Sequence, residues 1–279
     1  MSILSIQSHV AFGYVGNKAA VFPLQAMGYD VWPVHTVQFS NHTGYGAWQG
    51  EVFSAEHITS VVKGLEDLGA VSACRAILSG YMGTSAICEA VADIAARWKK
   101  INPEIVYLCD PVIGNTNCFV KPEVLDFFKT KLAADIITPN QFEAETLSGT
   151  TITDRASLGK VARFFHDRGT KIVVITGLKL AEAPDGLCVY ASDASGATLV
   201  QTNEFQFPIP VNGTGDLFSA LFLGSYLKHR DKTLALRHAV HFMQKVMQNT
   251  FERQTRELQV TSERYDWPEE TLLPEVVGF

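Results

Sequence analysis

The stretch VNGTGDLFSALFLGSYL, residues 211–227, decides how the rest of the chain is interpreted. Its small residues Gly213, Thr214 and Gly215 lead directly into Asp216, and an apolar run with helical character follows. Backbone N–H groups at a helix start are unpaired and carry partial positive charge, so a start without bulky side chains lets an anion approach closely. Alone, these four residues are better explained as a turn and an N-cap by Asp216. The rest of the chain must decide between the two interpretations.

Segments with strand character alternate with segments of helical character along most of the chain. The expected strands are 3–8, 29–39, 75–81, 104–111, 135–140 and 171–177, and the expected helices are 17–28, 55–69, 85–98, 123–132, 141–149 and 154–168, before two long C-terminal helices. We expect Pro33 to interrupt the pairing of its strand. The alternation predicts a largely parallel sheet with helices on both faces, and two strands near 186–203 predict an antiparallel edge. No linker rich in Gly, Ser or Pro is present, so we predict one α/β domain over residues 1–279.

Composition narrows the function classes further. The chain has 279 residues and a formal net charge of −6, and it has no long basic run. A nucleic acid is therefore not expected as a partner, because a phosphate backbone selects for clustered Lys and Arg. No apolar run is long enough for a membrane span, and the N-terminus lacks the pattern of a signal peptide. The five cysteines are scattered and odd in number, which favours reduced thiols, and we expect a cytoplasmic protein.

Polar residues follow several of the expected strands. The run CDPVIG places Asp110 after one strand, TPNQFE places Thr138 and Asn140 after another with Glu143 in the next helical turn, and Thr176 ends a third. Each residue alone is consistent with a turn or a helix cap. Ligands of such sheets bind at the carboxyl ends of the strands, so these residues are expected to meet beside the glycine-rich helix start. Carboxylates that bind a hard cation, next to N–H groups that bind phosphate oxygens, predict a Mg²⁺–phosphate site.

The motifs resemble the ribokinase-like superfamily of small-molecule kinases, in which GTGD opens a late helix and DPV and TPN followed by Glu precede it. The stretch SIQSHVAFGYVGNKAAVFPLQAMGYDVWPVHTVQFSNHTGYGAWQG (5–50) and the run SGYMG (79–83) resemble pyridoxal kinases, in particular their smaller bacterial branch. The resemblance covers most of the chain and weakens after about residue 255. It implies a single-domain ribokinase-like fold. It also implies ATP-dependent phosphorylation of the 5′-hydroxyl of pyridoxal, giving pyridoxal 5′-phosphate in vitamin B6 salvage.

The resemblance also implies roles for individual residues around the alcohol substrate. Asp216 corresponds to the catalytic base that takes the proton of the 5′-hydroxyl, and Gly213, Thr214 and Gly215 correspond to the anion hole. The implied substrate-binding residues are Ser8, Thr43, Gly44, Tyr81, Cys118 and Asp216. A lone histidine near a pocket is more often structural, so no catalytic role is assigned to the histidines of QSHV and SNHTGY.

A second group of residues is implied on the ATP side. It consists of Asp110, Thr138, Asn140, Glu143, Thr176, Phe207, Pro208 and Ile209. Glu143 and Asp110 are expected to hold Mg²⁺, and family members often use an activating monovalent cation such as K⁺. The family also implies a homodimer.

The flap GNTNCFV, residues 114–120, departs from the family pattern. Many pyridoxal kinases carry an acid where this chain has Asn115. Metal binding would then rest on Glu143, Asp110 and the phosphates, and slow turnover would follow. For Cys118 we hypothesise a reversible thiohemiacetal with the 4′-aldehyde of pyridoxal, with packing of the flap as the alternative.

Two other functions stay open. Hydroxymethylpyrimidine kinase is a close relative with a similar heterocyclic alcohol as substrate, but it commonly has Cys in place of the acid in GTGD, so Asp216 and the run QFSNHTGY argue against it. A vitamin B6 carrier or reservoir with weak kinase activity would keep the fold and the pyridoxal pocket. The presence of Asp216 and Glu143 favours catalysis, whereas Asn115 in place of the flap acid leaves the carrier function as an alternative.

Overall fold

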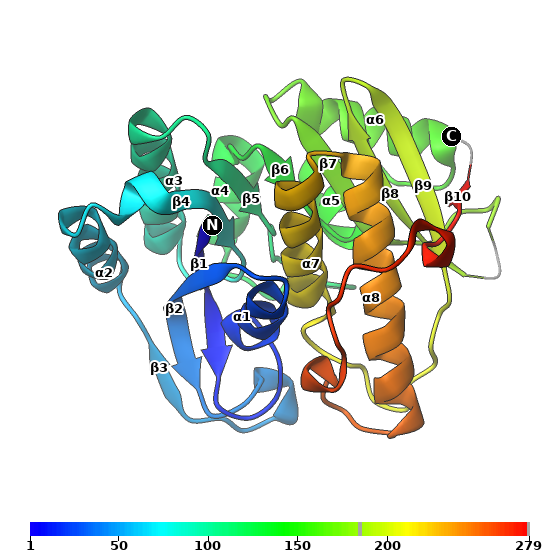
Figure 1. The fold of residues 1–279 in the computed structure, drawn as a ribbon, viewed down its shortest axis with the longest axis horizontal. Coiled ribbons are helices and arrows are strands. Elements are labelled where there is room, and N and C mark those ends of the chain that lie inside the picture. Colours follow the sequence, from blue (N-terminus) through cyan, green and yellow to red (C-terminus); the bar gives the residue numbers. More distant parts are fainter. Residues whose placement is uncertain (184–185, 278–279) are drawn as a thin grey trace.

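The structure, a computed structural model, describes residues 1–183 and 186–277. Within these residues one sheet has the strand order β10-β9-β8-β7-β6-β5-β4-β1-β2-β3 (Figure 1). The parallel strands are β1 (Ser2–Val10), β2 (Asp30–Phe39), β4 (Cys74–Ser79), β5 (Val106–Cys109), β6 (Ile136–Ile137) and β7 (Ile172–Leu178). The antiparallel strands are β3 (Gly50–Val52) at one end and β8 (Leu187–Asp193), β9 (Gly196–Thr202) and β10 (Val276–Val277) at the other.

Helices cover both faces of the sheet, each over its own apolar core. One face carries α2 (Ala55–Asp67), α3 (Ser85–Ile101), α4 (Pro122–Lys131), α5 (Gln141–Ser148) and α6 (Arg155–His166). The other carries α1 (Asn17–Ala26), α7 (Thr214–His229) and α8 (Lys232–Glu252), which lie in front of the sheet in Figure 1. Short 3₁₀ helices are η1 (Thr43–Tyr45), η2 (Ala70–Ala73), η3 (Val260–Ser262) and η4 (Glu270–Leu272). In the described part of the chain, no helix is both long and apolar enough to cross a membrane.

The predicted α/β fold and its antiparallel edge are confirmed, with two differences in detail. Pro33 does not interrupt its strand, because Ser5 pairs with Pro33 in an unbroken register and the irregularity comes later, between Gln7 and His9. The outer neighbour β3 pairs only with the end of β2, so the missing N–H of Pro33 lies on an open edge. The very short strands β3 and β10 were not predicted.

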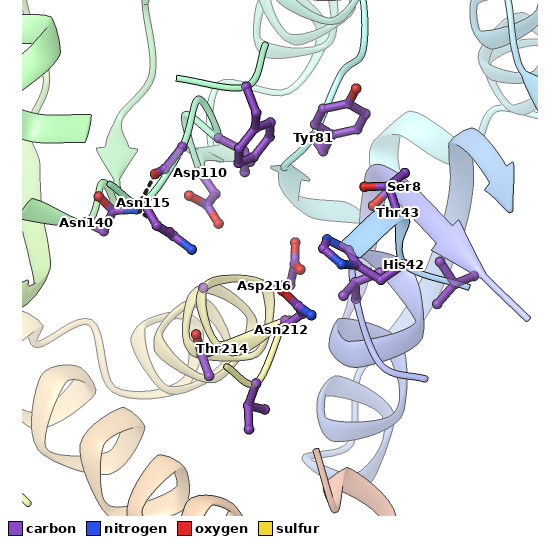
Figure 2. Close-up of a pocket in the computed structure, with 18 of the residues that line it drawn as sticks. Ser8, His42, Thr43, Tyr81, Asp110, Asn115, Asn140, Asn212, Thr214 and Asp216 are labelled. Carbon is purple, nitrogen blue, oxygen red and sulfur yellow. Dashed lines mark hydrogen bonds between the residues drawn. The ribbon is translucent and has the colours of Figure 1, made fainter. Parts of the chain in front are cut away.

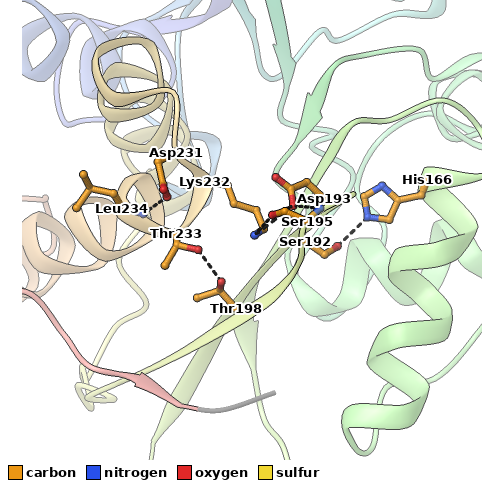
Figure 3. A network of polar contacts seen from close by, with 9 residues as sticks. All are labelled: His166, Ser192, Asp193, Ser195, Thr198, Asp231, Lys232, Thr233 and Leu234. Carbon is orange, nitrogen blue, oxygen red and sulfur yellow. Dashed lines mark hydrogen bonds and ion pairs between the residues drawn. The ribbon is translucent and has the colours of Figure 1, made fainter.

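The two edges of the sheet differ in their polar residues. We call the edge where the parallel strands end the carboxyl edge, and the opposite one the amino edge. Asp193 at the end of the antiparallel β8 lies on the amino edge, where its Oδ1 is 3.2 Å from Nζ of the buried Lys232 at the start of α8 (Figure 3). Beside it, His166 at the end of α6 makes a 2.8 Å hydrogen bond to Ser192. Both contacts join elements of the fold.

Candidate active site

The glycine-rich start of α7 is shaped by close backbone approach. Gly213 has φ 86°, and a Cβ there would lie 1.9 Å from the carbonyl oxygen of Tyr14. A Cβ on Gly215 would lie 3.3 Å from Oδ2 of Asp110. A glycine is therefore required at position 213, where the loop after β1 reaches the helix start, and the carboxylate after β5 leaves little room at position 215.

Asp216 does not cap its own helix. No side chain caps the start of α7, where Gly213 is the N-cap residue. The Asp216 carboxylate instead accepts a backbone hydrogen bond from Gly16. The N–H groups of the first turn thus stay available for a ligand, and the simpler interpretation of GTGD as a capped turn is wrong.

A cavity of about 410 Å³ opens at the carboxyl edge beside this helix start. Its size suits a small heterocycle together with part of a second ligand. Figure 2 shows Ser8, Thr43 and Tyr81 on one side of it and Asn115 and Asn140 on the other. The polar residues that line it are Ser8, His42, Thr43, Tyr81, Asp110, Asn115, Thr138, Asn140, Glu143, Thr176, Asn212, Thr214 and Asp216.

Three carboxylates share this cavity. Asp110 and Asp216 point into it in Figure 2, and Glu143 also lines it. Burial and the nearby Glu143 and Asp216 raise the pKa of Asp110 well above its usual value. Burial raises the pKa of Asp216 to about 6, against the backbone hydrogen bond from Gly16. Burial thus raises the pKa of both acids, and for Asp110 the neighbouring carboxylates add to it, so a cation bound in the cavity would favour the charged forms.

Glu143 joins two of the loops that build the site. Burial, with a smaller contribution from nearby Asp216, raises its pKa to about 7 against hydrogen bonds from backbone N–H groups. Its Oε1 accepts from the N–H of Ile113 at 2.9 Å and its Oε2 from the N–H of Asn140 at 2.9 Å. Asn140 in turn accepts from the N–H of Glu143, which completes a capping box at the start of α5. Glu143 thereby fixes the loop that follows β5 against the loop that follows β6.

The flap places different residues at the cavity than the sequence suggested. Asn115 lines the cavity, and its Oδ1 accepts a 3.1 Å hydrogen bond from Nδ2 of Asn140. Phe119 also lines it, with its ring centroid 6.4 Å from that of Tyr81. Cys118 is exposed and does not line the cavity, and its Sγ lies 3.8 Å from the carbonyl oxygen of Val120. The flap thus faces the cavity with Phe119 rather than with the neighbouring thiol.

A second cavity of about 540 Å³ adjoins the first along the start of α7. The two share Asn115, Asn140, Thr176, Val211, Thr214 and Gly215. The second continues over apolar side chains of α8, among them Met243 and Met247. The two cavities form one groove with the anion-binding helix start at its middle.

Most of the residues singled out from the sequence are brought together in this groove. Those that line it are Ser8, Thr43, Tyr81, Asp110, Thr138, Asn140, Glu143, Thr176, Gly213, Thr214, Gly215 and Asp216. Those that line neither cavity are Gly44, Cys118, Phe207, Pro208 and Ile209. Phe207 instead packs against Phe205 and Phe251, with ring centroids 6.4 and 5.7 Å away.

Several lining residues were missed. Asn212 directly precedes the GTGD motif, so proximity in sequence could have identified it. Phe119 is the aromatic residue of the flap, which was an available signal. Met243, Gln244 and Met247 carry no such signal, because one face of a long helix is an ordinary packing surface.

The acids of the groove can contribute to a metal site but do not form a complete one. In residues 1–183 and 186–277, no group of three or more His, Cys, Asp or Glu side chains is arranged to hold an ion. Asp110 and Glu143 offer hard oxygen ligands next to the helix start where phosphates would bind, which suits Mg²⁺ coordinated mostly by phosphate oxygens and water.

Comparisons with known proteins agree with this geometry. The phosphomethylpyrimidine kinase family profile matches residues 50–261. The pyridoxal kinase of Corynebacterium diphtheriae is 45% identical over 263 residues, which cover 92% of each chain. That of Granulibacter bethesdensis is 42% identical over 276 residues, which cover 96% of each chain. The solved pyridoxal kinase from Leishmania donovani in complex with ADP and pyridoxine has a TM-score of 0.89 at 35% identity, covering 99% of this chain and 98% of the other.

The family profile alone names kinases of pyrimidines, whereas the relatives that match over nearly the whole length are pyridoxal kinases. The ribokinase-like fold inferred from GTGD, DPV and TPN is confirmed by the solved relative. The chain therefore belongs to the phosphomethylpyrimidine kinase family and, within it, to the pyridoxal kinases.

Proposed function

We propose that this protein transfers the γ-phosphoryl group of ATP to the 5′-hydroxyl of pyridoxal, giving pyridoxal 5′-phosphate. The observation that carries the proposal is the Asp216 carboxylate, which points into the groove from the first turn of α7. A primary alcohol is a poor nucleophile and needs a positioned base, and the phosphoryl group needs donors that neutralise its charge. Both requirements meet at this helix start.

Asp216 acts as the base. Its pKa, raised to about 6 by burial, leaves the carboxylate ionised at neutral pH but more basic than an exposed Asp. The hydrogen bond from Gly16 holds it in place. It accepts the hydroxyl proton as the new oxygen–phosphorus bond forms, while the N–H groups of Gly213, Thr214 and Gly215 bind the equatorial oxygens of the phosphoryl group.

The first cavity binds the alcohol substrate. Ser8 and Thr43 supply hydroxyl groups. Gly44 follows Thr43 in η1 but does not line the cavity, and it is proposed to reach the substrate only if this turn shifts toward it. Tyr81 and Phe119 supply aromatic surface for a pyridine ring. The carbonyl of Tyr81 accepts a 2.7 Å hydrogen bond from Thr36, which fixes the position of this wall. Cys118 is proposed only as a reactive thiol that reaches the aldehyde if the flap moves.

The second cavity binds ATP, with its base over the apolar side chains of α8 and its phosphates toward α7. Asn140 and Thr176 line both cavities, where they would meet the phosphates. Thr138 is buried and shares a 2.8 Å hydrogen bond with Ser219, so it supports the site from beneath. Phe207, Pro208 and Ile209 are proposed to reach the base only if their segment shifts toward the groove.

Asp110 and Glu143 would hold Mg²⁺, and their carboxylates fit it because they are hard oxygen donors whose pKa values are raised by burial and by neighbouring carboxylates, Glu143 and Asp216 for Asp110 and Asp216 for Glu143. When bound, Mg²⁺ supplies positive charge beside the phosphate oxygens. A monovalent cation such as K⁺ is proposed to bind on the same side. We further propose a homodimer in the cytoplasm, which size-exclusion chromatography with light scattering and cell fractionation would check.

The test is product formation from Mg-ATP with pyridoxal and, in parallel, with hydroxymethylpyrimidine. We expect phosphorylation of pyridoxal with a kcat/KM at least about 10-fold above that for the pyrimidine, because the cavity presents hydroxyls and aromatic walls to a pyridine ring. Preference for the pyrimidine would assign the protein to the other activity of the family. Tight binding of pyridoxal without product would support the vitamin B6 carrier.

A further inference from the structure

The segment that follows α8, residues 255–258, contacts two loops that contribute residues to the first cavity. It is anchored by Leu258, which is fully buried in the core between α1, α7 and α8. From this anchor, Arg256 and Glu257 reach loops that are more than 200 positions away in sequence. These contacts connect the substrate side of the groove to a part of the chain that carries no site residue.

Arg256 holds the short helix η1. Its Nη2 donates a 2.7 Å hydrogen bond to the carbonyl oxygen of Gly44. Its guanidinium lies 3.7 Å from the centroid of the Tyr45 ring, a distance at which a cation and an aromatic face attract each other. Thr43, the predicted substrate contact, belongs to the same η1 turn, so Arg256 fixes its backbone.

Glu257 joins η1 to the loop that follows β1. Its Oε1 accepts a 2.6 Å hydrogen bond from the hydroxyl of Tyr45, and its Oε2 accepts a 3.1 Å hydrogen bond from the N–H of Tyr14. A Cβ on Gly13, which has φ +91°, would lie 2.2 Å from Oε2, so a glycine is required there. One carboxylate thereby ties two loops with charge-assisted hydrogen bonds.

The second of these loops leads directly to the catalytic helix start. The carbonyl oxygen of Tyr14 is the atom that a side chain on Gly213 would meet, and Val15 lines the cavity. The N–H of Gly16 donates to the Asp216 carboxylate. Glu257 is therefore linked on one side to the turn that carries Thr43 and on the other to the loop that orients Asp216.

We propose that Glu257 is a positioning residue for the alcohol substrate, assisted by Arg256. It holds the loop of residues 12–16 and the turn of residues 42–45 in the arrangement that pyridoxal needs, and it acts on the pyridoxal half of the groove rather than on the ATP half. This inference rests on the proposed function. Without the hydrogen bonds to Glu257, both loops would become ordered only when pyridoxal binds. The cost of ordering them would lower the affinity for pyridoxal.

The variant Glu257→Ala tests the role. We expect its KM for pyridoxal to rise by about 10-fold or more, the size expected when two hydrogen bonds to a charged group are lost. The KM for ATP and the melting temperature are expected to stay near the wild-type values, because Leu258 still anchors the segment. Glu257→Gln should restore most of the affinity, since its carbonyl can accept from the Tyr14 N–H while its amide donates to the Tyr45 hydroxyl.

Glu252→Ala is the matched control. It removes an acid five positions earlier that accepts a hydrogen bond from Gln248 on its own helix, and it should change neither KM. An equal rise in both KM values together with a lower melting temperature would assign Glu257 a merely structural role and overturn the proposal. Unchanged kinetics in Glu257→Ala would also overturn it.

Hydrogen exchange separates this inference from the proposed function. In Glu257→Ala, the amides of residues 12–16 and 42–46 should exchange about 10-fold faster or more, while those of Glu257→Gln and Glu252→Ala should not. Unchanged exchange rates in these two loops would refute the claim that Glu257 orders them, whichever reaction the enzyme catalyses. A wild-type protein that does not phosphorylate pyridoxal would instead refute the proposed function, and the exchange rates would still decide whether Glu257 orders the loops.

Discussion

Asp110 and Asp135 lie at opposite edges of the sheet, Asp110 directly after β5 and Asp135 directly before the neighbouring β6. Both are buried, and both would be costly charges if left unpaired. Asp110 faces Glu143 and Asp216, which together with burial raise its pKa. It is surrounded by charges of its own sign.

Asp135 has the opposite environment. Lys99 forms an ion pair with its Oδ2, the N–H of Tyr107 donates to the same oxygen at 2.9 Å, and Lys171 approaches Oδ1 at 2.9 Å. Burial alone would raise the pKa of Asp135, but these partners lower it below its usual value. Asp193 and Lys232 repeat the pattern further along this edge (Figure 3).

The difference shows which acids serve the fold and which serve chemistry. Opposite charges and backbone donors are matched to the carboxylates of the amino edge, so these residues stabilise the native state. At the carboxyl edge the corresponding charges are left for a ligand to neutralise. Replacing an acid by its amide should therefore lower the free energy of unfolding at the amino edge and raise it, in the absence of ligands, at the carboxyl edge.

The largest effect is expected from Asp216→Asn. Removal of a general base lowers kcat by roughly 100- to 10,000-fold. Binding of pyridoxal should change little, because Ser8, Thr43 and Tyr81 remain in the cavity. Steady-state rates and a binding titration measure the two quantities, and a variant that keeps more than half of the wild-type rate would exclude the role of base.

Asp135→Asn should lower the free energy of unfolding by about 2 kcal/mol, since hydrogen bonds to a buried charge are lost. The pKa of Asp135 is lowered in the folded state, so this stabilisation is present above the pKa of about 3.9 of an unfolded Asp and is lost as the pH falls through the folded value. Urea unfolding at several pH values should show a constant difference from pH 5 to 8 that shrinks below about pH 4.

The control for this variant is Asp67→Asn, which breaks the exposed pair of Asp67 with Lys63 on α2. Exposed pairs of this kind contribute little, so its stability should stay within about 0.5 kcal/mol of the wild type. Equal losses in the two variants would mean that the amino edge has no special role in stability.

Asp110→Asn should have the opposite sign. Without Mg²⁺ and nucleotide, the free energy of unfolding should rise by about 1 kcal/mol, because like charges no longer face each other. The same variant should be less active and should gain less stability from added Mg-ATP than the wild type does. A lower free energy of unfolding in the ligand-free variant would show that repulsion between Asp110 and its neighbouring carboxylates does not destabilise the wild-type protein.

Asn115→Asp should lower the Mg²⁺ concentration needed for half-maximal rate by several-fold, because it adds a carboxylate where the two cavities meet. The hydrogen bond from Asn140 to Oδ1 can be kept in this variant. Asn117→Asp adds the same charge to the flap away from both cavities and should leave the Mg²⁺ dependence unchanged. The same response in both variants would point to a general charge effect.

The smallest effect is expected from Cys118→Ser. Cys118 is exposed and Phe119 takes the position at the cavity, so affinities for pyridoxal and pyridoxine should both stay within about twofold. Pyridoxine carries an alcohol where pyridoxal carries the aldehyde. A loss of affinity for pyridoxal alone would support the thiohemiacetal hypothesis. It would also mean that the flap moves when pyridoxal binds.

The parts of the site that could be predicted from the sequence are those governed by local rules. A helix start without bulky side chains is visible in the letters GTGD, and the carboxyl ends of parallel strands meet at one edge wherever the strands lie in the chain. Asp110, Thr138 and Thr176, which are expected from this rule to meet beside the helix start, line the same cavity as Asp216.

The parts that could not be predicted depend on contacts between distant segments. Glu257 and Tyr45 are 212 positions apart, and no periodicity or motif relates them. The partners of Asp135 come from α3 and from the residue before β7, so its stabilising role depends on packing. The effect of Pro33 was mispredicted because it depends on how much of β2 is covered by β3.

The most direct test of this division of roles compares Asp216→Asn and Asp135→Asn at a temperature where both variants are folded. The formation of ADP and pyridoxal 5′-phosphate from Mg-ATP and pyridoxal is measured beside the free energy of unfolding. We predict that Asp216→Asn loses product formation at wild-type or higher stability, and that Asp135→Asn loses stability but forms product at close to the wild-type rate. Wild-type product formation by Asp216→Asn, or an equal loss of product in both variants, would contradict the account.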